Sequence, residues 1–277
     1  MGSLLEHTKD HADGSPNGGP HKPHHVTGHY LASEGELFAS AAEQGELSVE
    51  ITPCPGWDMR ELVRHLGMIH LWAAANVAFP ASDWLDVQDL PDLVQYYPEL
   101  ASGYPADADP VGWYRDTLAN LIDVLQSAPA DLECFAFLPA SSPLTMWARR
   151  QASEIAIHRF DAELARETPS HFDPHFATDM LDELMSGFTP RPRAVDIQSP
   201  EVIHVHAQDT NEHWYVSIGA EQTDTSRQGD HADLTLTGTA ADLYVLLWNR
   251  APGTSITMSG NTDLMDLWRG NFRVRWG

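Results

Sequence analysis

The sequence has few basic residues and lacks long apolar runs. Lys and Arg together number 16 against 40 Asp and Glu, so the formal net charge is −24 at pH 7. A surface this acidic repels phosphate backbones and anionic lipid headgroups, which disfavours nucleic acid and membrane surfaces as partners. The apolar runs are shorter than the roughly 18 residues that a membrane span needs. The first residues, MGSLLEHTKD, fit neither a secretory signal peptide nor a myristoylation site.

Cysteine is also scarce, because Cys54 and Cys134 are the only two in the chain. Two cysteines exclude a disulfide framework and a zinc ribbon, and two reduced thiols are typical of a cytoplasmic protein, which is the location we predict. The sequence lacks G-x-S-x-G, a glycine-rich phosphate loop and H-E-x-x-H. Histidine, in contrast, is abundant at 15 residues.

The length of 277 residues is sufficient for two domains with a substantial core. Residues 1–25 are rich in Gly, Pro and His and have no apolar period, which predicts a disordered tail. We predict one domain over residues 26–194 and a second over residues 195–277, because the hydrophobic period changes from 3.6 to 2 after the segment Thr189-Pro-Arg-Pro-Arg193.

The first domain is predicted to be helical. Apolar residues at helical spacing predict helices over residues 26–44, 58–78, 109–126, 142–167 and 174–187, which favours an antiparallel bundle. Asp58 and Glu61 have the spacing of a capping box at the start of the second helix. Residues 80–110 are acidic and Pro-rich, and we predict a long irregular segment there.

The second domain is predicted to be a small α/β unit. Alternating or β-branched residues predict strands over residues 202–207, 213–218, 232–237, 255–259 and 272–276. Helical patterns separate some of these strands, over residues 240–249 and 261–269.

A Glu and a His lie in an apolar part of the predicted fourth helix. Glu154 and His158 are four residues apart, so they share one helix face, and Ile155-Ala156-Ile157 lies between them. A buried carboxylate is costly unless it is paired or bound to a cation. The pair therefore suits metal binding, although a salt bridge or core hydrogen bond is the more common use of such a pair.

The second predicted helix offers a third candidate ligand. His65 lies in the middle of this helix, and His70 is the weaker candidate because it points elsewhere. If the bundle directs His65 towards Glu154 and His158, these three ligands would leave coordination positions open, which is typical of a catalytic metal. Zn²⁺ is the default ion, and other first-row metals fit the same ligands.

Two helical motifs together resemble a known family. Thr52-Pro-Cys-Pro-Gly-Trp57, followed by Arg60-Glu-Leu-Val-Arg-His65-Leu, resembles the mycothiol-dependent maleylpyruvate isomerase family of the DinB-like superfamily. The family's fourth-helix motif, W-x-R-R-x-x-x-E-x-x-x-H-R-x-D-A, is matched by Trp147, Arg149, Arg150, Glu154, His158, Arg159, Asp161 and Ala162. Gly238-Thr-Ala-Ala-Asp-Leu-Tyr and Asp266-Leu-Trp-Arg resemble its C-terminal domain. The resemblance covers about residues 26–277.

The resemblance implies a fold, a metal and a cofactor. The fold is an N-terminal DinB-like antiparallel four-helix bundle followed by a small α/β, SCP2-like domain. The metal ligands are His65, Glu154 and His158, and the ion is expected to be Zn²⁺. The thiol cofactor is mycothiol, which is a thiol of actinobacteria. The partners are then mycothiol and an electrophilic, carboxylate-bearing small molecule, and the protein is a monomer or a small homo-oligomer.

The chemistry implied is addition of a thiolate to an electrophile. A free thiol has a pKa of about 8.5, so a coordinating metal is needed to make it a thiolate at neutral pH. Addition to a cis double bond permits rotation, and elimination then returns the trans product, which is isomerisation. If the adduct is retained, the reaction is an S-transfer.

Three further residues are candidates for a catalytic role: Arg150, Asp161 and Arg250. Asp161 could support His158 or pair with Arg159. Arg150 could bind a carboxylate, but an internal salt bridge is the more common use in so acidic a chain.

The arginines of the second domain are candidates to contact an anionic substrate, and the sequence does not choose among them: Arg250, Arg269, Arg273 and Arg275. Cys54 is interpreted as structural, since the family takes its thiol from outside the chain.

Two other functions stay open at this point. The chain could be a non-catalytic protein that binds a metal and a small molecule, or a DinB-like metal-dependent hydrolase that uses water in place of a thiol. An open metal position that faces a thiol-binding pocket would favour the isomerase or S-transferase.

Overall fold

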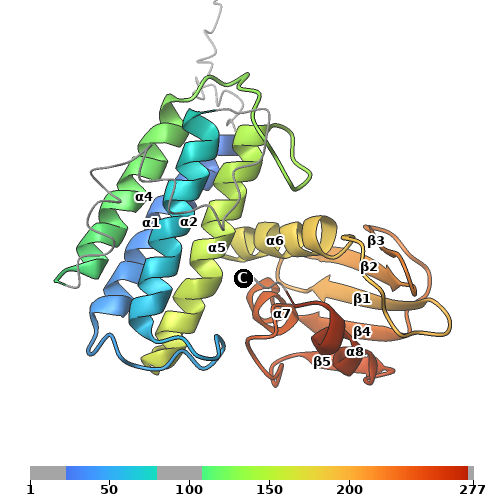
Figure 1. Ribbon diagram of the computed structural model, residues 1–277. Helices are drawn as coiled ribbons and strands as arrows, with labels where there is room; N and C mark the ends of the chain where they lie inside the picture. Colours follow the sequence, from blue (N-terminus) through green and yellow to red (C-terminus); the bar gives the residue numbers. More distant parts are fainter. Residues whose placement is uncertain (1–22, 80–107, 274–277) are drawn as a thin grey trace, which may run out of the picture.

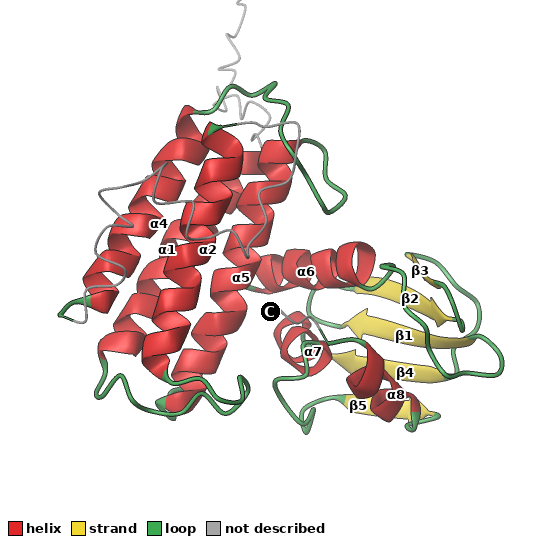
Figure 2. Cartoon of the chain, in the orientation of Figure 1, coloured by secondary structure: helices red, strands yellow, loops and turns green. Residues whose placement is uncertain are grey.

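The computed structural model of the protein describes residues 23–79 and 108–273. A group of long helices lies beside a smaller part in which helices cover a sheet (Figure 1). Figure 2 shows that the helices of the first part and the strands of the second part are separate in space. This agrees with the predicted order of a helical domain followed by an α/β domain.

Four long helices make up the bundle: α1 (Pro23–Glu43), α2 (Met59–Ala78), α4 (Pro110–Ser127) and α5 (Pro143–Ala165). Helix α1 packs mainly on α5 and also on α4, whereas α2 packs mainly on α4 and also on α5. These bounds agree with the predicted helices to within a few residues. The predicted segment over residues 80–110 lies almost entirely outside the described residues, as does most of the predicted tail over residues 1–25.

Capping residues fix the starts of the two helices that carry the candidate ligands. Asp58 accepts a hydrogen bond from the backbone N–H of Glu61, and the Glu61 carboxylate accepts one from the N–H of Asp58, so the predicted capping box is present. Ser142 caps α5 through the N–H of Thr145. Caps of this kind contribute about 1 kcal/mol each to stability.

The fifth predicted helix is divided in two. Helix α6 (Pro174–Glu183) ends in a π-helical segment, η2 (Leu184–Phe188), and α6 packs against helix α7 (Ala240–Leu247). The predicted boundary near residue 195 stays a prediction.

The second part contains a mixed sheet in the order β3-β2-β1-β4-β5. Its strands are β1 (Glu201–Ala207), β2 (Glu212–Ile218), β3 (Thr223–Ser226), β4 (Leu234–Gly238) and β5 (Thr257–Gly260). Strands β1 and β4 are parallel, and the other pairs are antiparallel. Residues at alternate positions of β1 and β2, such as Val205 and Trp214, are fully buried towards the helices.

Three local predictions need correction. Strand β3 was not predicted, because its sequence, Thr-Asp-Thr-Ser, has no apolar alternation. Helix α8 spans Leu264–Asn271, a few residues later than predicted. The strand predicted over residues 272–276 is wrong in its described part. Phe272 ends α8 and stacks on Trp268 with ring centroids 4.4 Å apart, because this contact buries both rings. Residues 274–276 lie outside the described residues.

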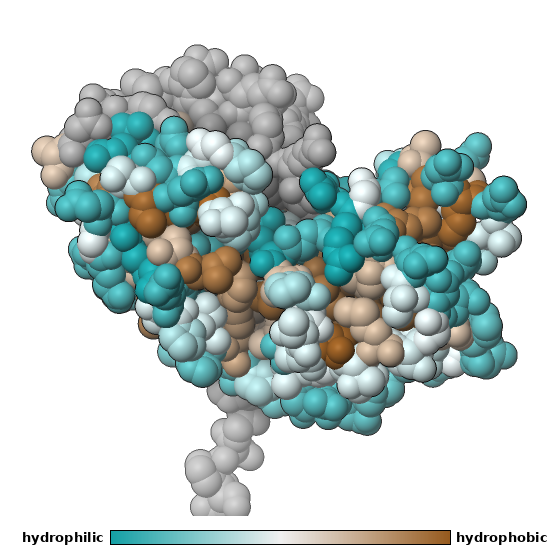
Figure 3. All heavy atoms as spheres, turned by 90° about the horizontal axis from the view of Figure 1, so that it is seen from below, coloured by the Kyte–Doolittle hydropathy of each residue, from teal (hydrophilic) through white to brown (hydrophobic). Residues whose placement is uncertain are grey.

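The face seen from below is largely hydrophilic (Figure 3). Seen from below, hydrophilic residues surround smaller hydrophobic areas (Figure 3). Within the described residues, no helix combines the length and the apolar character that a membrane span requires.

Candidate metal centre

Helix α5 buries an unusual number of polar side chains. Its buried polar residues are Arg150, Gln151, Ser153, Glu154, His158, Arg159, Asp161 and Glu163. Charged side chains are rarely buried unless they are paired or functional. One of them, Arg159, pairs with Glu163 of the same helix and with Glu34 of α1. The remainder of the charged group faces α2 and the second part of the chain.

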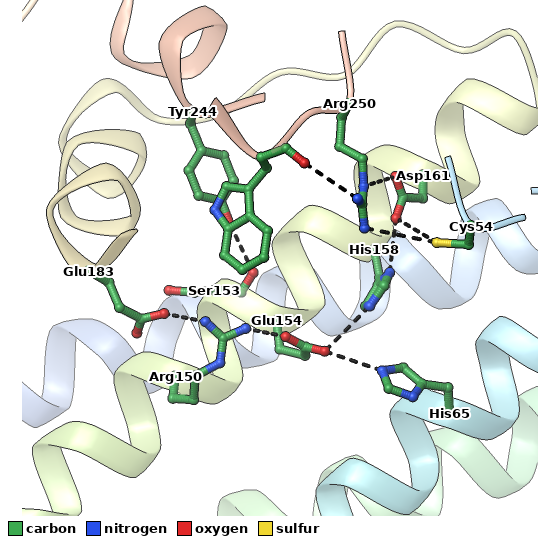
Figure 4. A network of polar contacts seen from close by, with 11 residues as sticks. Cys54, His65, Arg150, Ser153, Glu154, His158, Asp161, Glu183, Tyr244 and Arg250 are labelled. Carbon is green, nitrogen blue, oxygen red and sulfur yellow. Dashed lines mark hydrogen bonds and ion pairs between the residues drawn. The ribbon is translucent and has the colours of Figure 1, made fainter. Parts of the chain in front are cut away.

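The structure brings the three predicted ligands together. His65 Nε2 lies 3.2 Å from Glu154 Oε1, and His158 Nε2 lies 3.3 Å from the same oxygen. The three ligand atoms lie within 4.8 Å of one another. Figure 4 shows both imidazoles directed at the Glu154 carboxylate, with His65 from α2 and the other two residues from α5. His70, the weaker candidate, is buried elsewhere and contacts Thr117 Oγ1 at 3.2 Å.

Each of the two ligands on α5 is oriented by a buried partner. Asp161 Oδ2 lies 2.9 Å from His158 Nδ1, and it accepts the proton of that nitrogen in the tautomer that leaves Nε2 free as a ligand. Arg150 donates to Glu154 Oε2 and, through its other terminal nitrogen, to Glu183 at the end of α6. Oε1 of Glu154 is therefore the oxygen that faces the histidines.

The second part of the chain supplies the edge of the site. Arg250, just after α7, donates from Nε to Asp161 Oδ1 at 2.9 Å. Its Nη2 lies 3.9 Å from Cys54 Sγ, and that sulfur lies 3.5 Å from Asp161 Oδ2. Tyr244 of α7 donates to the backbone carbonyl of Ser153 at 3.1 Å. The site is thus assembled from both parts (Figure 4).

The turn before α2 explains how Cys54 reaches the site. Ile51 and Trp57 form a backbone hydrogen bond across the turn, and Gly56 has a φ of +87°, which favours glycine. This turn places the Trp57 ring 4.8 Å from the His65 ring and 6.4 Å from the His158 ring. Trp57 therefore forms one wall of the site.

The protonation states are dictated by burial and by the partners. Burial opposes ionisation of Glu154, but Arg150 and both histidines lower its pKa well below the usual range. Burial lowers the pKa of His65. Burial would also lower the pKa of His158, but hydrogen bonds to Asp161, Cys54 and Glu154 raise it well above the ordinary value. A proton on His158 thus takes the place that a cation could fill.

The donor set and the charge balance both fit a metal ion. Two imidazole nitrogens and one carboxylate oxygen are a ligand set that Zn²⁺ uses in catalytic sites. The network has three carboxylates, on Glu154, Asp161 and Glu183, but two guanidinium groups, on Arg150 and Arg250. With neutral histidines one negative charge is uncompensated, and a bound cation would balance it.

Sequence reasoning missed several residues of the site and left others open. Among the four candidate arginines, Arg250 contacts the site, through Asp161. Arg269 instead pairs with Asp266 on the surface. Arg275 lies outside the described residues. Arg149 pairs with Asp179 and Asp182. Cys54 lies in the site, next to Asp161 and Arg250. Its position in the turn just before the helix that carries His65 could have indicated this. Glu183 had no signal in the sequence.

Comparisons with known proteins agree with this architecture. The model of the mycothiol maleylpyruvate isomerase N-terminal domain matches residues 31–163, and that of the MDMPI C-terminal domain matches residues 171–267. A crystal structure of the mycothiol-dependent maleylpyruvate isomerase is similar with a TM-score of 0.59 and 12% identity, over 86% of this chain and 93% of that chain. An alanine mutant of that isomerase is similar at the same TM-score and coverage with 11% identity. At 11–12% identity, these two structural matches show that the chain shares their fold. No curated protein sequence matches the chain.

Proposed function

The chain belongs to the mycothiol-dependent maleylpyruvate isomerase family, and we propose that it isomerises a cis double bond of a carboxylate-bearing electrophile with mycothiol as its thiol cofactor. The observation that carries this proposal is the convergence of His65, Glu154 and His158 on one point in a buried, oriented network at the border of the two parts.

We propose that these three side chains hold a divalent ion, with Zn²⁺ as the expected metal. When bound, the ion and mycothiol together supply a thiolate at neutral pH, which is the nucleophile that adds reversibly to the double bond. A site with three protein ligands keeps room for a further ligand. The residues of the chain prepare this position before either group binds.

The first contribution of the chain is to fix the ligands. Asp161 holds the His158 tautomer with a free Nε2, and Arg150 holds Oε2 of Glu154, so neither ligand has to reorganise when a cation binds. Arg150 is almost completely buried and engaged by two carboxylates. We therefore propose that Arg150 positions Glu154 and does not itself contact the substrate.

The second contribution is to bind and orient the substrate. Arg250 uses Nε for Asp161, and its side chain retains some exposure at the edge of the site. A guanidinium at this position can donate to a substrate carboxylate with the nitrogens that do not contact Asp161. Trp57 covers the histidine side, which keeps water away from the reacting atoms.

The remaining expectations belong to the same proposal. We infer a cytoplasmic enzyme from the two free cysteines and from a cofactor that is a cellular thiol. The partners are mycothiol and the electrophile, and the acidic chain disfavours nucleic acid. A monomer or a small homo-oligomer is expected.

The test is metal analysis followed by calorimetric titration with mycothiol. We compare the wild-type chain with His158→Ala and with the control His175→Ala, which changes an exposed histidine of α6. Stoichiometric metal, thiol binding that depends on it, and conversion of maleylpyruvate to its trans isomer are expected for wild type and control. The metal equivalent of this centre, the thiol binding and the conversion should all be lost in His158→Ala.

Two results would contradict the proposal in different ways. Bound metal without any binding of mycothiol would favour a hydrolase that uses water. A folded wild-type chain that takes up no metal would favour a binding protein without metal-dependent chemistry.

A further inference from the structure

Three histidines gather on the sheet face that points away from helices α6, α7 and α8. His204 and His206 alternate on β1 and so share one face, and His213 lies directly opposite His206 on β2. All three side chains are partly exposed, whereas their neighbours Ile203, Val205 and Trp214 are buried on the helix side. The predicted function makes no use of these histidines.

Two of these histidines already have ligand atoms close together. His204 Nε2 and His213 Nδ1 form a hydrogen bond at 3.0 Å, and a bound metal ion would take the place of its proton. The His206 ring stacks on the His213 ring with centroids 4.2 Å apart, and its Nε2 is buried with no hydrogen-bond partner among the described residues. Ligands about 2.0–2.1 Å from one zinc ion lie roughly 3.0–3.4 Å apart, so the first pair has the spacing of two ligands of one ion.

The chemistry of the group suits a transition metal. Burial and the neighbouring imidazoles lower the pKa of both His204 and His213, so the rings are neutral at pH 7 and carry lone pairs. Neutral imidazole nitrogen is a preferred ligand of Zn²⁺, Cu²⁺ and Ni²⁺, and three histidines are an established zinc ligand set. The net charge of −24 also attracts cations to the surface.

We propose that His204, His206 and His213 form a second metal site, separate from the centre in the bundle, which takes one divalent transition-metal ion. His204 and His213 provide the preformed pair. His206 joins them by rotation of its partly exposed side chain, because it projects from the same face two residues along the strand. The solvent-facing side of the ion stays open to water or to a small ligand.

Zn²⁺ binding to the full chain tests the proposal. Each chain is stripped with a chelator and titrated with Zn²⁺ against a chromophoric competitor, and the bound equivalents are counted. The variants are His204→Phe and His213→Phe, because phenylalanine keeps a ring against Tyr215 and His206 but offers no ligand nitrogen. Both variants are expected to bind one equivalent fewer than wild type. His206→Phe should weaken that equivalent at least tenfold.

The controls separate this site from every other source of metal binding. His231→Phe changes an exposed histidine of the same part and should bind as wild type does. Histidines of the N-terminal tail are the same in all chains, so their contribution cancels. Loss of the second equivalent should leave isomerase activity intact, whereas His158→Ala removes a different equivalent.

Cu²⁺ supplies an independent readout, because nitrogen ligands give a hyperfine pattern in the electron paramagnetic resonance spectrum. We expect this pattern to lose one component in His204→Phe and in His213→Phe. Thermal melting verifies that both variants are folded. If the folded variants bind as many equivalents of Zn²⁺ as wild type and their Cu²⁺ spectra are unchanged, the proposal is wrong.

Discussion

Asp161 supports one predicted metal ligand and one arginine, so its replacement tests the site directly. The carboxylate is fully buried, with Oδ2 2.9 Å from His158 Nδ1 and Oδ1 2.9 Å from Arg250 Nε. It accepts a hydrogen bond on each oxygen. The substitution Asp161→Asn keeps the shape of the side chain but replaces one acceptor by a donor.

Either orientation of the new amide disturbs the site. If its oxygen faces His158, the NH2 group faces Arg250 Nε–H and two donors oppose each other. If its NH2 faces His158, Nδ1 must become the acceptor, and the proton moves to Nε2, which then cannot bind a metal. The charge-assisted bond to Arg250 is preserved in the second orientation alone, so the wrong tautomer of His158 is favoured.

The size of the effect follows from this competition. Loss of a carboxylate partner of a metal-bound histidine typically costs 10–100-fold in metal affinity, which corresponds to about 1.4–2.7 kcal/mol. Because the Asp161 pocket is fully buried, we expect the upper half of that range. The same change leaves Arg150 and Glu154 in place, so some metal binding should persist.

The assay is a Zn²⁺ competition titration at pH 7 on wild type, Asp161→Asn and the control Asp179→Asn. Asp179 pairs with Arg149 on the surface and has no contact with the ligands among the described residues. Circular dichroism verifies the fold of each protein. A Kd of folded Asp161→Asn within twofold of wild type would refute the argument that Asp161 fixes the His158 tautomer.

Three further predictions address substrate binding, pH dependence and the tail. Replacing Arg250 by Ala should raise KM for the electrophile by roughly 10- to 160-fold, since a charge-assisted hydrogen bond contributes about 1.5–3 kcal/mol; an unchanged KM in a metal-loaded variant would contradict this role. Burial raises the pKa of Glu34 to about 7 despite Arg159 at 2.7 Å, with Glu163, Tyr30 and Tyr114 as its other neighbours. The folded chain therefore holds a proton that the unfolded chain loses near pH 4.5, so Glu34 makes stability fall as the pH rises from about 4.5 to 7, by up to about 3 kcal/mol. Denaturant titrations should show a flatter profile for Glu34→Gln, and identical profiles would exclude Glu34 as the cause. Deletion of residues 1–25 should leave the melting temperature and the Zn²⁺ bound by the central site unchanged, and a large fall in either would overturn the tail assignment.

The fold was predictable where the sequence pattern is local. Helix α2 has a cap and an apolar face, and α5 begins with a capping serine followed by proline; these signals are visible in a window of about 20 residues, so the bounds follow closely. Strand β3 has neither signal, because its four polar residues are held in place by pairing with β2. The end of the chain alternates apolar and basic residues, yet Phe272 follows Trp268 at a helical spacing and stacks on it. There tertiary packing decides against the local pattern.

Contacts within α5 follow from helix geometry, whereas His65 of α2 was found through its helix position and the family motif, and the contacts of Arg250 and Cys54 were not predictable. Glu154, His158 and Asp161 lie on consecutive turns of one helix, so their proximity follows from helix geometry alone. The contact of Arg250 with Asp161 spans 89 residues, and that of Cys54 with Asp161 spans 107. No spacing rule reaches across such separations, and a sequence without aligned relatives offers no other guide to them.

These long contacts also explain why the second part is required for the site. Asp161 stands between His158 on one side and Arg250 on the other, and Tyr244 docks α7 onto the carbonyl of Ser153 next to Glu154. Docking of the second part therefore brings Arg250 to the edge of the candidate site, and the same contact holds Asp161, the hydrogen-bond partner of His158. A bundle without residues 171–273 would keep the three ligand side chains but lose Arg250 and Glu183, the groups that hold Asp161 and Arg150 from outside the bundle. The orientation of the three candidate ligands is for this reason a property of the whole chain.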